Sequence, residues 1–198
     1  PQTEAQKWKP ALPSMIHYRY SGSEFSSWTN LELLGCTENW DATPPYYCPR
    51  EAQRLREMTK LQFDDYVDSL QADGFTYHDA GMIWGARFVS PNGIFATANQ
   101  SAPNGEAISR HIVFMTDGQL VTRQNLYGRY GIEFWDRRVT DNGSASQQSQ
   151  NHAARFQAAC RAARNENVSV WVVAFGTELT QNLIDCATPG RAYEASNS

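Results

Sequence analysis

Arg110-His111-Ile112-Val113-Phe114-Met115-Thr116-Asp117-Gly118 is the stretch that decides the fold, because an apolar run stops there at an acidic residue followed by glycine. A continuous Ile-Val-Phe-Met run bounded by polar residues predicts a strand that is buried on both faces. The end of that strand would deliver Asp117 to the carboxyl edge of a sheet. Open α/β sheets place their ligand sites at this edge.

Composition and charge limit the classes of partner. The chain has 198 residues, of which 41% are hydrophobic, and this is long enough for one well-packed core and short for two. Only 19% of the residues are charged and the formal net charge is −4, so no basic field is present to attract nucleic acid or anionic lipid. No apolar stretch approaches the roughly 20 residues that a membrane-spanning helix needs, so we expect no membrane span in this chain.

The four cysteines, Cys36, Cys48, Cys160 and Cys186, are widely separated and contain no Cys-x-x-Cys pair. Zinc sites usually bring paired ligands at short spacing, so disulfides are the better interpretation. The natural pairing among three connectivities is Cys36 with Cys48 and Cys160 with Cys186, which would place the protein in an oxidising compartment. Free buried thiols in a cytosolic protein are the alternative.

The order of predicted elements indicates an α/β domain preceded by a different kind of segment. Residues 1–50 are proline-rich and loop-like with one strand-like stretch at 14–20, whereas apolar residues over 55–70 and 78–89 follow helical spacing. Residues 119–148 are polar and predict a surface loop or a partly disordered insertion. After them we expect a helix at 152–164, a strand at 168–175, a short helix at 180–186 and a strand at 192–195. This alternation predicts right-handed βαβ units and a mostly parallel sheet.

Thr76 and Asp117 are the candidate ligand residues. A hydroxyl that heads one helix and a carboxylate that ends a central strand are both oxygen ligands, the type that Mg²⁺ prefers. Two residues do not complete an octahedral site, however. The alternative is that Thr76 caps its helix and that Asp117 turns the chain together with Gly118.

Three segments together resemble a known family. They are Asp73-Gly74-Phe75-Thr76-Tyr77-His78-Asp79-Ala80-Gly81-Met82-Ile83-Trp84-Gly85-Ala86-Arg87, then Ser90-Pro91-Asn92-Gly93, then the stretch from His111 to Gly118. This set resembles the von Willebrand factor A-type domain of bacterial TadG-like proteins, which belong to the tight-adherence, or Flp pilus, assembly system. Residues 168–176 and the cysteines at 160 and 186 resemble the same family's closing helix and strand. The resemblance covers roughly residues 48–198, so we expect a flank at 1–50 and the C-terminal part of such a domain at 51–198.

The resemblance implies a Rossmann-like, mostly parallel sheet with helices on both faces and a metal-ion-dependent adhesion site at its top. Thr76 and Asp117 would carry the threonine loop and the second aspartate loop of a site for Mg²⁺, or for Mn²⁺ or Ca²⁺. The family's first loop, Asp-x-Ser-x-Ser, is absent, and Asp141-Asn142-Gly143-Ser144-Ala145-Ser146 has the wrong spacing and position to replace it. We therefore expect a sheet that is incomplete at its N-terminal side, with a rearranged edge or a partner strand, and a partial metal site. The family also implies a membrane anchor upstream.

The function that follows from the resemblance is a non-enzymatic, extracytoplasmic protein-interaction domain in Flp-type pilus assembly or surface adherence. The partner would be a protein of the pilus or adherence machinery. A structural scaffold with no functional metal site is one alternative. Another is a metal-assisted hydrolase, which would need Asp117 beside a second carboxylate, with Asp79 as the nearest candidate. His78 and His111 are further acid/base candidates, but the chain contains no Gly-x-Ser-x-Gly, His-Glu-x-x-His or phosphate-binding glycine motif.

Overall fold

The structure, a computed structural model, describes residues 18–20, 28–30, 50–70, 75–102, 104–123, 127–128, 130–133 and 137–196. The chain divides into two compact units, one formed by residues 1–48 and 123–148 and the other by residues 49–122 and 149–198. The predicted boundary between 1–50 and 51–198 stays a prediction. The second unit contains Thr76, Asp117 and most of the described structure.

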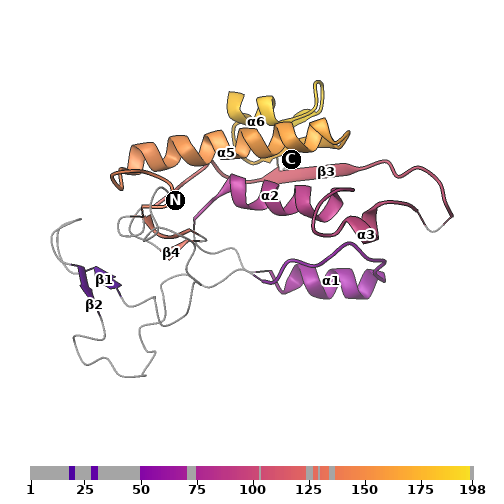
Figure 1. Cartoon of the computed structure of the whole chain (residues 1–198), viewed down its shortest axis with the longest axis horizontal. Coiled ribbons are helices and arrows are strands. Elements are labelled where there is room, and N and C mark those ends of the chain that lie inside the picture. Colours follow the sequence, from indigo (N-terminus) through magenta and orange to yellow (C-terminus); the bar gives the residue numbers. More distant parts are fainter. Residues whose placement is uncertain are drawn as a thin grey trace. The chain divides into compact units, whose positions relative to one another are not determined.

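A three-stranded parallel sheet forms the centre of the second unit. Its strand order is β3 (His111–Thr116), β6 (Ser169–Phe175) and β7 (Ala192–Ala195), and its register pairs Val113 with Trp171 and Val173 with Tyr193. The chain passes from β3 to β6 through helix α5 (Ala145–Asn165), and from β6 to β7 through helix α6 (Gln181–Cys186). These two crossovers are the predicted βαβ units, and the fold class is mixed α/β (Figure 1).

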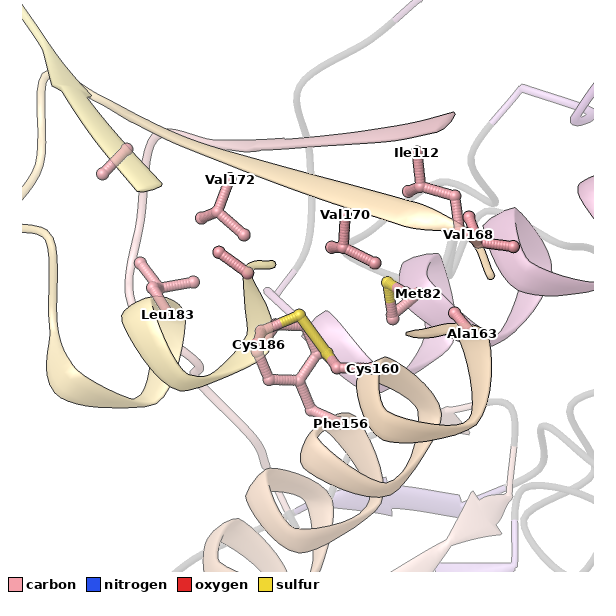
Figure 2. Packing of buried hydrophobic residues seen from close by; sticks show 12 residues of the cluster. Met82, Ile112, Phe156, Cys160, Ala163, Val168, Val170, Val172, Leu183 and Cys186 are labelled. Atoms are coloured by element: carbon pink, nitrogen blue, oxygen red, sulfur yellow. A yellow bond between two sulfur atoms is a disulfide. The ribbon is translucent and has the colours of Figure 1, made fainter. Parts of the chain in front are cut away.

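The core lies between one face of this sheet and three helices. Ile112, Val170, Val172 and Ala174 alternate with less buried residues along β3 and β6, as expected for strands with one packed face. Figure 2 shows the side chains of Ile112, Val170 and Val172 pointing toward α5, α6 and helix α2 (His78–Val89). The helices contribute Met82, Phe156, Cys160, Ala163, Leu183 and Cys186 to the same cluster. Complete burial stabilises by about 1.5–3 kcal/mol for each large side chain, so this cluster is the main stabilising feature of the unit.

A disulfide joins two helices inside this core. Cys160 on α5 and Cys186 at the end of α6 are bonded and fully buried, which is the distal pairing expected from the sequence. The Arg164 guanidinium on α5 donates hydrogen bonds to the backbone oxygens of Asp185 and Ala187, at 3.0 and 3.3 Å. Basic side chains commonly satisfy the last carbonyl groups of a helix in this way. Cys36 and Cys48 lie outside the described residues.

The opposite face of the sheet differs from the prediction. We expected β3 to be buried on both faces, but Val113 and Met115 are each 63% exposed, so this expectation is wrong. The reason is that α2, α5 and α6 all contribute to the cluster on the Ile112 side. The expected covering of both faces by helices is therefore not found for β3 within the described residues.

Helix α1 (Lys60–Asp68) is shorter than the predicted segment 55–70 and buries none of its residues. Its first turn is stabilised by a capping box, in which the Gln62 N–H donates to the Thr59 hydroxyl and the Thr59 N–H donates to the Gln62 side chain. Lys60 and Asp64 add an ion pair one turn apart. A short four-residue helix, α3 (Ala96–Asn99), follows α2. No helix in the described ranges has the length and hydrophobicity needed to cross a bilayer.

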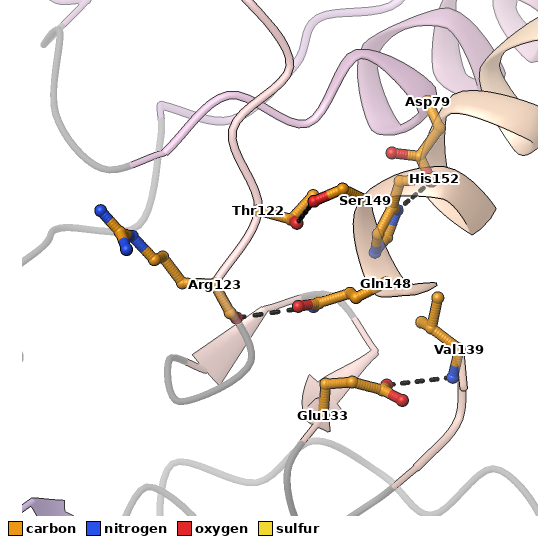
Figure 3. Close-up of polar contacts among 8 residues, drawn as sticks. All are labelled: Asp79, Thr122, Arg123, Glu133, Val139, Gln148, Ser149 and His152. Carbon is orange, nitrogen blue, oxygen red and sulfur yellow. Dashed lines mark hydrogen bonds and ion pairs between the residues drawn. The ribbon is translucent and has the colours of Figure 1, made fainter. Parts of the chain in front are cut away.

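The first unit contains two short antiparallel pairs. Strands β1 (Tyr18–Tyr20) and β2 (Trp28–Asn30) form one, and β4 (Tyr127–Gly128) and β5 (Gly131–Ile132) form the other. Directly after β5, the buried Glu133 carboxylate accepts a 3.0 Å hydrogen bond from the Val139 N–H (Figure 3). It also accepts a 2.7 Å hydrogen bond from the Thr140 N–H. The polar segment 119–148 therefore contains the β4–β5 pair and a loop that is held by hydrogen bonds to the Glu133 carboxylate.

Candidate functional site

The structure brings the two predicted ligand loops together. Asp117 directly follows β3 and is exposed, at the carboxyl end of the sheet. The Val121 N–H donates a 3.0 Å hydrogen bond to the Thr76 carbonyl oxygen. A Cβ atom placed on Gly118 would lie 3.8 Å from the Thr76 hydroxyl oxygen. The Thr76 loop and the Asp117–Gly118 turn are therefore neighbours at the predicted edge.

Thr76 does not cap helix α2. The N-cap residue is Tyr77, whose side chain makes no capping hydrogen bond, and Thr76 lies one residue before it. The capping alternative is therefore wrong for Thr76, because a capping side chain must occupy the N-cap position to reach the free N–H groups of the first turn. Within the described part of the chain, the Thr76 hydroxyl makes no hydrogen bond. Its oxygen is available to a ligand that approaches this edge.

The His78 side chain contacts the Asp117–Gly118 turn through a hydrogen bond. Its Nε2 lies 3.2 Å from the Gly118 carbonyl oxygen and 3.3 Å from the Thr116 hydroxyl. The same hydroxyl donates to the Gly118 carbonyl oxygen at 2.9 Å and accepts from the Gly118 N–H at 3.2 Å. Burial lowers the pKa of His78, while its hydrogen bond to Gly118 and the nearby Asp79 act in the opposite direction. Because a carbonyl oxygen only accepts, Nε2 is the donor in the contact with Gly118, and this hydrogen bond positions the turn.

A buried pair fixes the start of α2 against α5. The Asp79 Oδ2 atom lies 2.9 Å from the His152 Nδ1 atom, and the two side chains are 0% and 1% exposed (Figure 3). The Tyr77 ring also contacts His152 edge-on, with 4.9 Å between ring centroids. Since α2 begins two residues after Thr76, this pair holds the Thr76 loop in place.

The hydrolase alternative required Asp117 and Asp79 to share a site. Asp79 is fully buried against His152, whereas Asp117 is exposed on the turn, so the two carboxylates do not face one accessible space.

His111 lies at the amino end of β3, the end opposite to Asp117. Its Nδ1 accepts a 3.1 Å hydrogen bond from the Trp171 indole, and its Nε2 lies 2.8 Å from the Ser109 hydroxyl. Because an indole N–H only donates, Nδ1 of His111 is the acceptor in its contact with Trp171.

The fit to a divalent cation is partial. Thr76 and Asp117 provide one hydroxyl and one carboxylate, which are suitable oxygen ligands for Mg²⁺. The described residues contain no group of three or more histidine, cysteine, aspartate or glutamate side chains arranged to hold a metal ion. Water, or groups outside the described ranges, would have to complete six-fold coordination.

The segment from Asp141 to Ser146 leads into helix α5. The Asn142 side chain accepts a 2.9 Å hydrogen bond from the Ser144 N–H, and the Ser144 hydroxyl accepts a 3.4 Å bond from the Gln147 N–H. Ser144 directly precedes α5, so it occupies the capping position of that helix. The Asp-Asn-Gly-Ser sequence is a helix start.

Sequence reasoning missed His152 and Glu133. His152 had a detectable signal, because it lies four residues before Phe156 on the apolar stripe of α5 that also carries Cys160. A histidine on a buried stripe needs a partner, but the sequence does not say that the partner is Asp79. Glu133 had no comparable signal, since its partners are backbone groups of a loop.

Comparison with known proteins found no match: no family model, curated protein or solved structure resembles this chain closely enough to identify it.

Proposed function

We propose that this chain is an extracytoplasmic protein-interaction domain of the von Willebrand A type, acting in Flp-type pilus assembly or surface adherence. The observation that carries the proposal is the adjacency of Thr76 to the Asp117–Gly118 turn at the carboxyl end of a parallel sheet. The quoted sequence motifs supply the resemblance, and the buried Cys160–Cys186 disulfide favours an oxidising compartment.

The proposed chemistry is a shared cation. Asp117 would contribute one negative charge and Thr76 a neutral oxygen, so a bound Mg²⁺ would keep a net positive charge. A carboxylate from a partner protein would neutralise that charge and complete part of the coordination shell. In this scheme, the protein's own residues orient the cation, and the buried His78 and Asp79 keep the two loops together.

Calorimetric titration with Mn²⁺ and with Mg²⁺ tests this proposal. We expect weak binding to the wild-type chain and loss of the binding heat in Asp117→Asn, which removes the charge and keeps the shape. Asp141→Asn is the matched control, because it removes an exposed carboxylate from the start of α5 and leaves the Thr76 edge intact. Equal binding by wild type and Asp117→Asn would refute the role of Asp117.

A structural scaffold is the second candidate. It is the alternative in which Thr76 and Asp117 hold no cation. In that case neither cation produces a binding heat with the wild-type chain, and Asp117→Asn leaves partner capture in a cell-envelope extract unchanged.

A further inference from the structure

The outer edge of strand β3 has peptide groups without partners in the described part of the chain. The Ser169 N–H donates a 2.9 Å hydrogen bond to the Arg110 carbonyl oxygen, so the peptide groups of Arg110 point toward β6. Peptide groups alternate in direction along a strand, and those of Ile112 and Phe114 therefore also point toward β6. Those of Val113 and Met115 point away from it, to the free edge. The edge thus offers a template for one more strand.

Helix α2 places an aromatic row beside this edge. Gly81 and Gly85 face β3, because a Cβ atom on either would lie 3.6 Å from Phe114 or Ile112. Met82 packs into the core on the β6 side of this glycine stripe. Successive residues of an α-helix are rotated by about 100° around its axis. By this rotation, Trp84 and Phe88 lie on the other side of Gly81 and Gly85 from Met82, toward the free edge of β3.

The row is continuous; Trp84 is exposed, and Phe88 and Phe95 are half-buried. The rings of Trp84 and Phe88 lie 5.8 Å apart and those of Phe88 and Phe95 are stacked at 5.2 Å, while Trp84 is 39% exposed. A strand added at β3 would lay the side chains of one face on this row. Its other face would continue the surface that carries Val113 and Met115.

Charge indicates what such a strand would carry. The Arg87 guanidinium lies 4.9 Å from the centre of the Trp84 ring, and that of Arg54 lies 4.8 Å from the centre of the Phe95 ring. Within the described ranges, no carboxylate pairs with either arginine. Two cations over the aromatic rings of this row favour a ligand that combines apolar and acidic side chains.

We propose that the free edge of β3 binds an extended segment of a partner protein as an additional parallel strand, with apolar residues on Trp84 and Phe88 and carboxylates at Arg87 and Arg54. Parallel addition continues the described sheet, in which every pairing is parallel. Helix α2 runs opposite to β3, since Gly81 faces Phe114 and Gly85 faces Ile112. Arg87 is therefore level with the start of β3, and the acidic residues belong at the amino end of the added strand. This β3 edge site uses neither Thr76 nor Asp117.

The test uses a synthetic peptide, acetyl-Glu-Glu-Val-Thr-Val-Thr-Val-Thr-amide, and amide hydrogen exchange by NMR in the presence of EDTA. We expect the peptide to slow exchange at Val113 and Met115. Ile112 and Phe114, which face β6, should be protected with and without peptide. A peptide with two lysines in place of the glutamates should bind more weakly.

Two variants at one position separate backbone pairing from side-chain effects. Val113→Pro removes an outward N–H at an edge position where proline is tolerated, and it should weaken peptide binding by about tenfold. Val113→Thr keeps the N–H and should bind like the wild type. If Val113→Pro lowers the protection of the β6 amides, Trp84→Ala takes its place as the test variant. It should also weaken peptide binding.

Two results would overturn the proposal. One is equal peptide binding by wild type and a folded Val113→Pro variant. The other is protection of Val113 and Met115 before peptide is added. Protection that disappears on dilution would identify a second copy as the occupant, and protection that persists would identify another segment of this chain. Because EDTA is present throughout, a failure here is distinguishable from a failure of the cation site.

Discussion

Removal of the Cys160–Cys186 disulfide should destabilise the second unit by an amount that follows from its position. The two cysteines are 26 residues apart, and loop-closure entropy for a loop of this length corresponds to about 3.5 kcal/mol at 25 °C. Both sulfur atoms are buried in the core, so replacement by alanine adds the loss of their packing. The double variant Cys160→Ala/Cys186→Ala should therefore lose at least this much stability.

Native-state hydrogen exchange measures this loss within the unit that contains the bond. The amides of Val170 and Val172 lie in the core strand β6, and 3.5 kcal/mol predicts exchange about 300-fold faster than in the wild type. Arg161→Ala, an exposed position on the same helix, is the control and should change stability by less than about 0.5 kcal/mol. A loss below about 1 kcal/mol in the double variant would refute the view that this bond constrains the unfolded chain.

Two further predictions concern the contacts of α2. Burial lowers the pKa of His78 below its ordinary value of 6.5, so the unfolded chain binds a proton more readily, and wild-type stability should fall as the pH decreases below about 6.5. Thermal melts from pH 7.5 to 5.5 should show a smaller decrease for His78→Gln, and an equal decrease would contradict the assignment. Gly85→Ala should stabilise by up to about 1 kcal/mol, because its methyl group meets Ile112 at an ordinary contact distance and alanine favours helix; destabilisation in urea titrations would show that α2 and β3 need glycine.

The sequence was a good guide wherever a local pattern and a local stop signal agreed. Helix α2 begins and ends as predicted at 78–89, because helical spacing runs up to the Ser90-Pro91 boundary. Helix α5 begins at Ala145, earlier than the predicted residue 152, because the residues between are polar and give no periodic signal. Its start depends on the Ser144 cap, which looks like loop sequence.

The candidate site was predictable as a location and only partly as chemistry. The apolar run that ends at Asp117 predicts that this residue lies at the carboxyl edge of a sheet, and the family resemblance implies that Thr76 lies beside it. The contacts of His78 and Asp79 that hold these two loops could not be predicted. The contact between Asp79 and His152 joins residues 73 positions apart, and the hydrogen bond from His78 to Gly118 spans 40. Such pairings are set by how the helices pack, and single-sequence patterns do not encode them.

The mistaken prediction for β3 is itself informative. Ile-Val-Phe-Met is a composition typical of parallel strands covered on both faces, yet only the face with Ile112 is packed by the described helices. Scattered exposed apolar residues are normal, but Val113 and Met115 adjoin Trp171 and Val173 on the next strand, and Tyr193, 46% exposed, continues this surface on β7. Covering such side chains would stabilise by about 1 kcal/mol or more each. A strand added at the free edge of β3 would extend this face without covering it. The apolar residues on this face are therefore a separate observation from the outward peptide groups, which are the physical reason for placing a partner strand at β3.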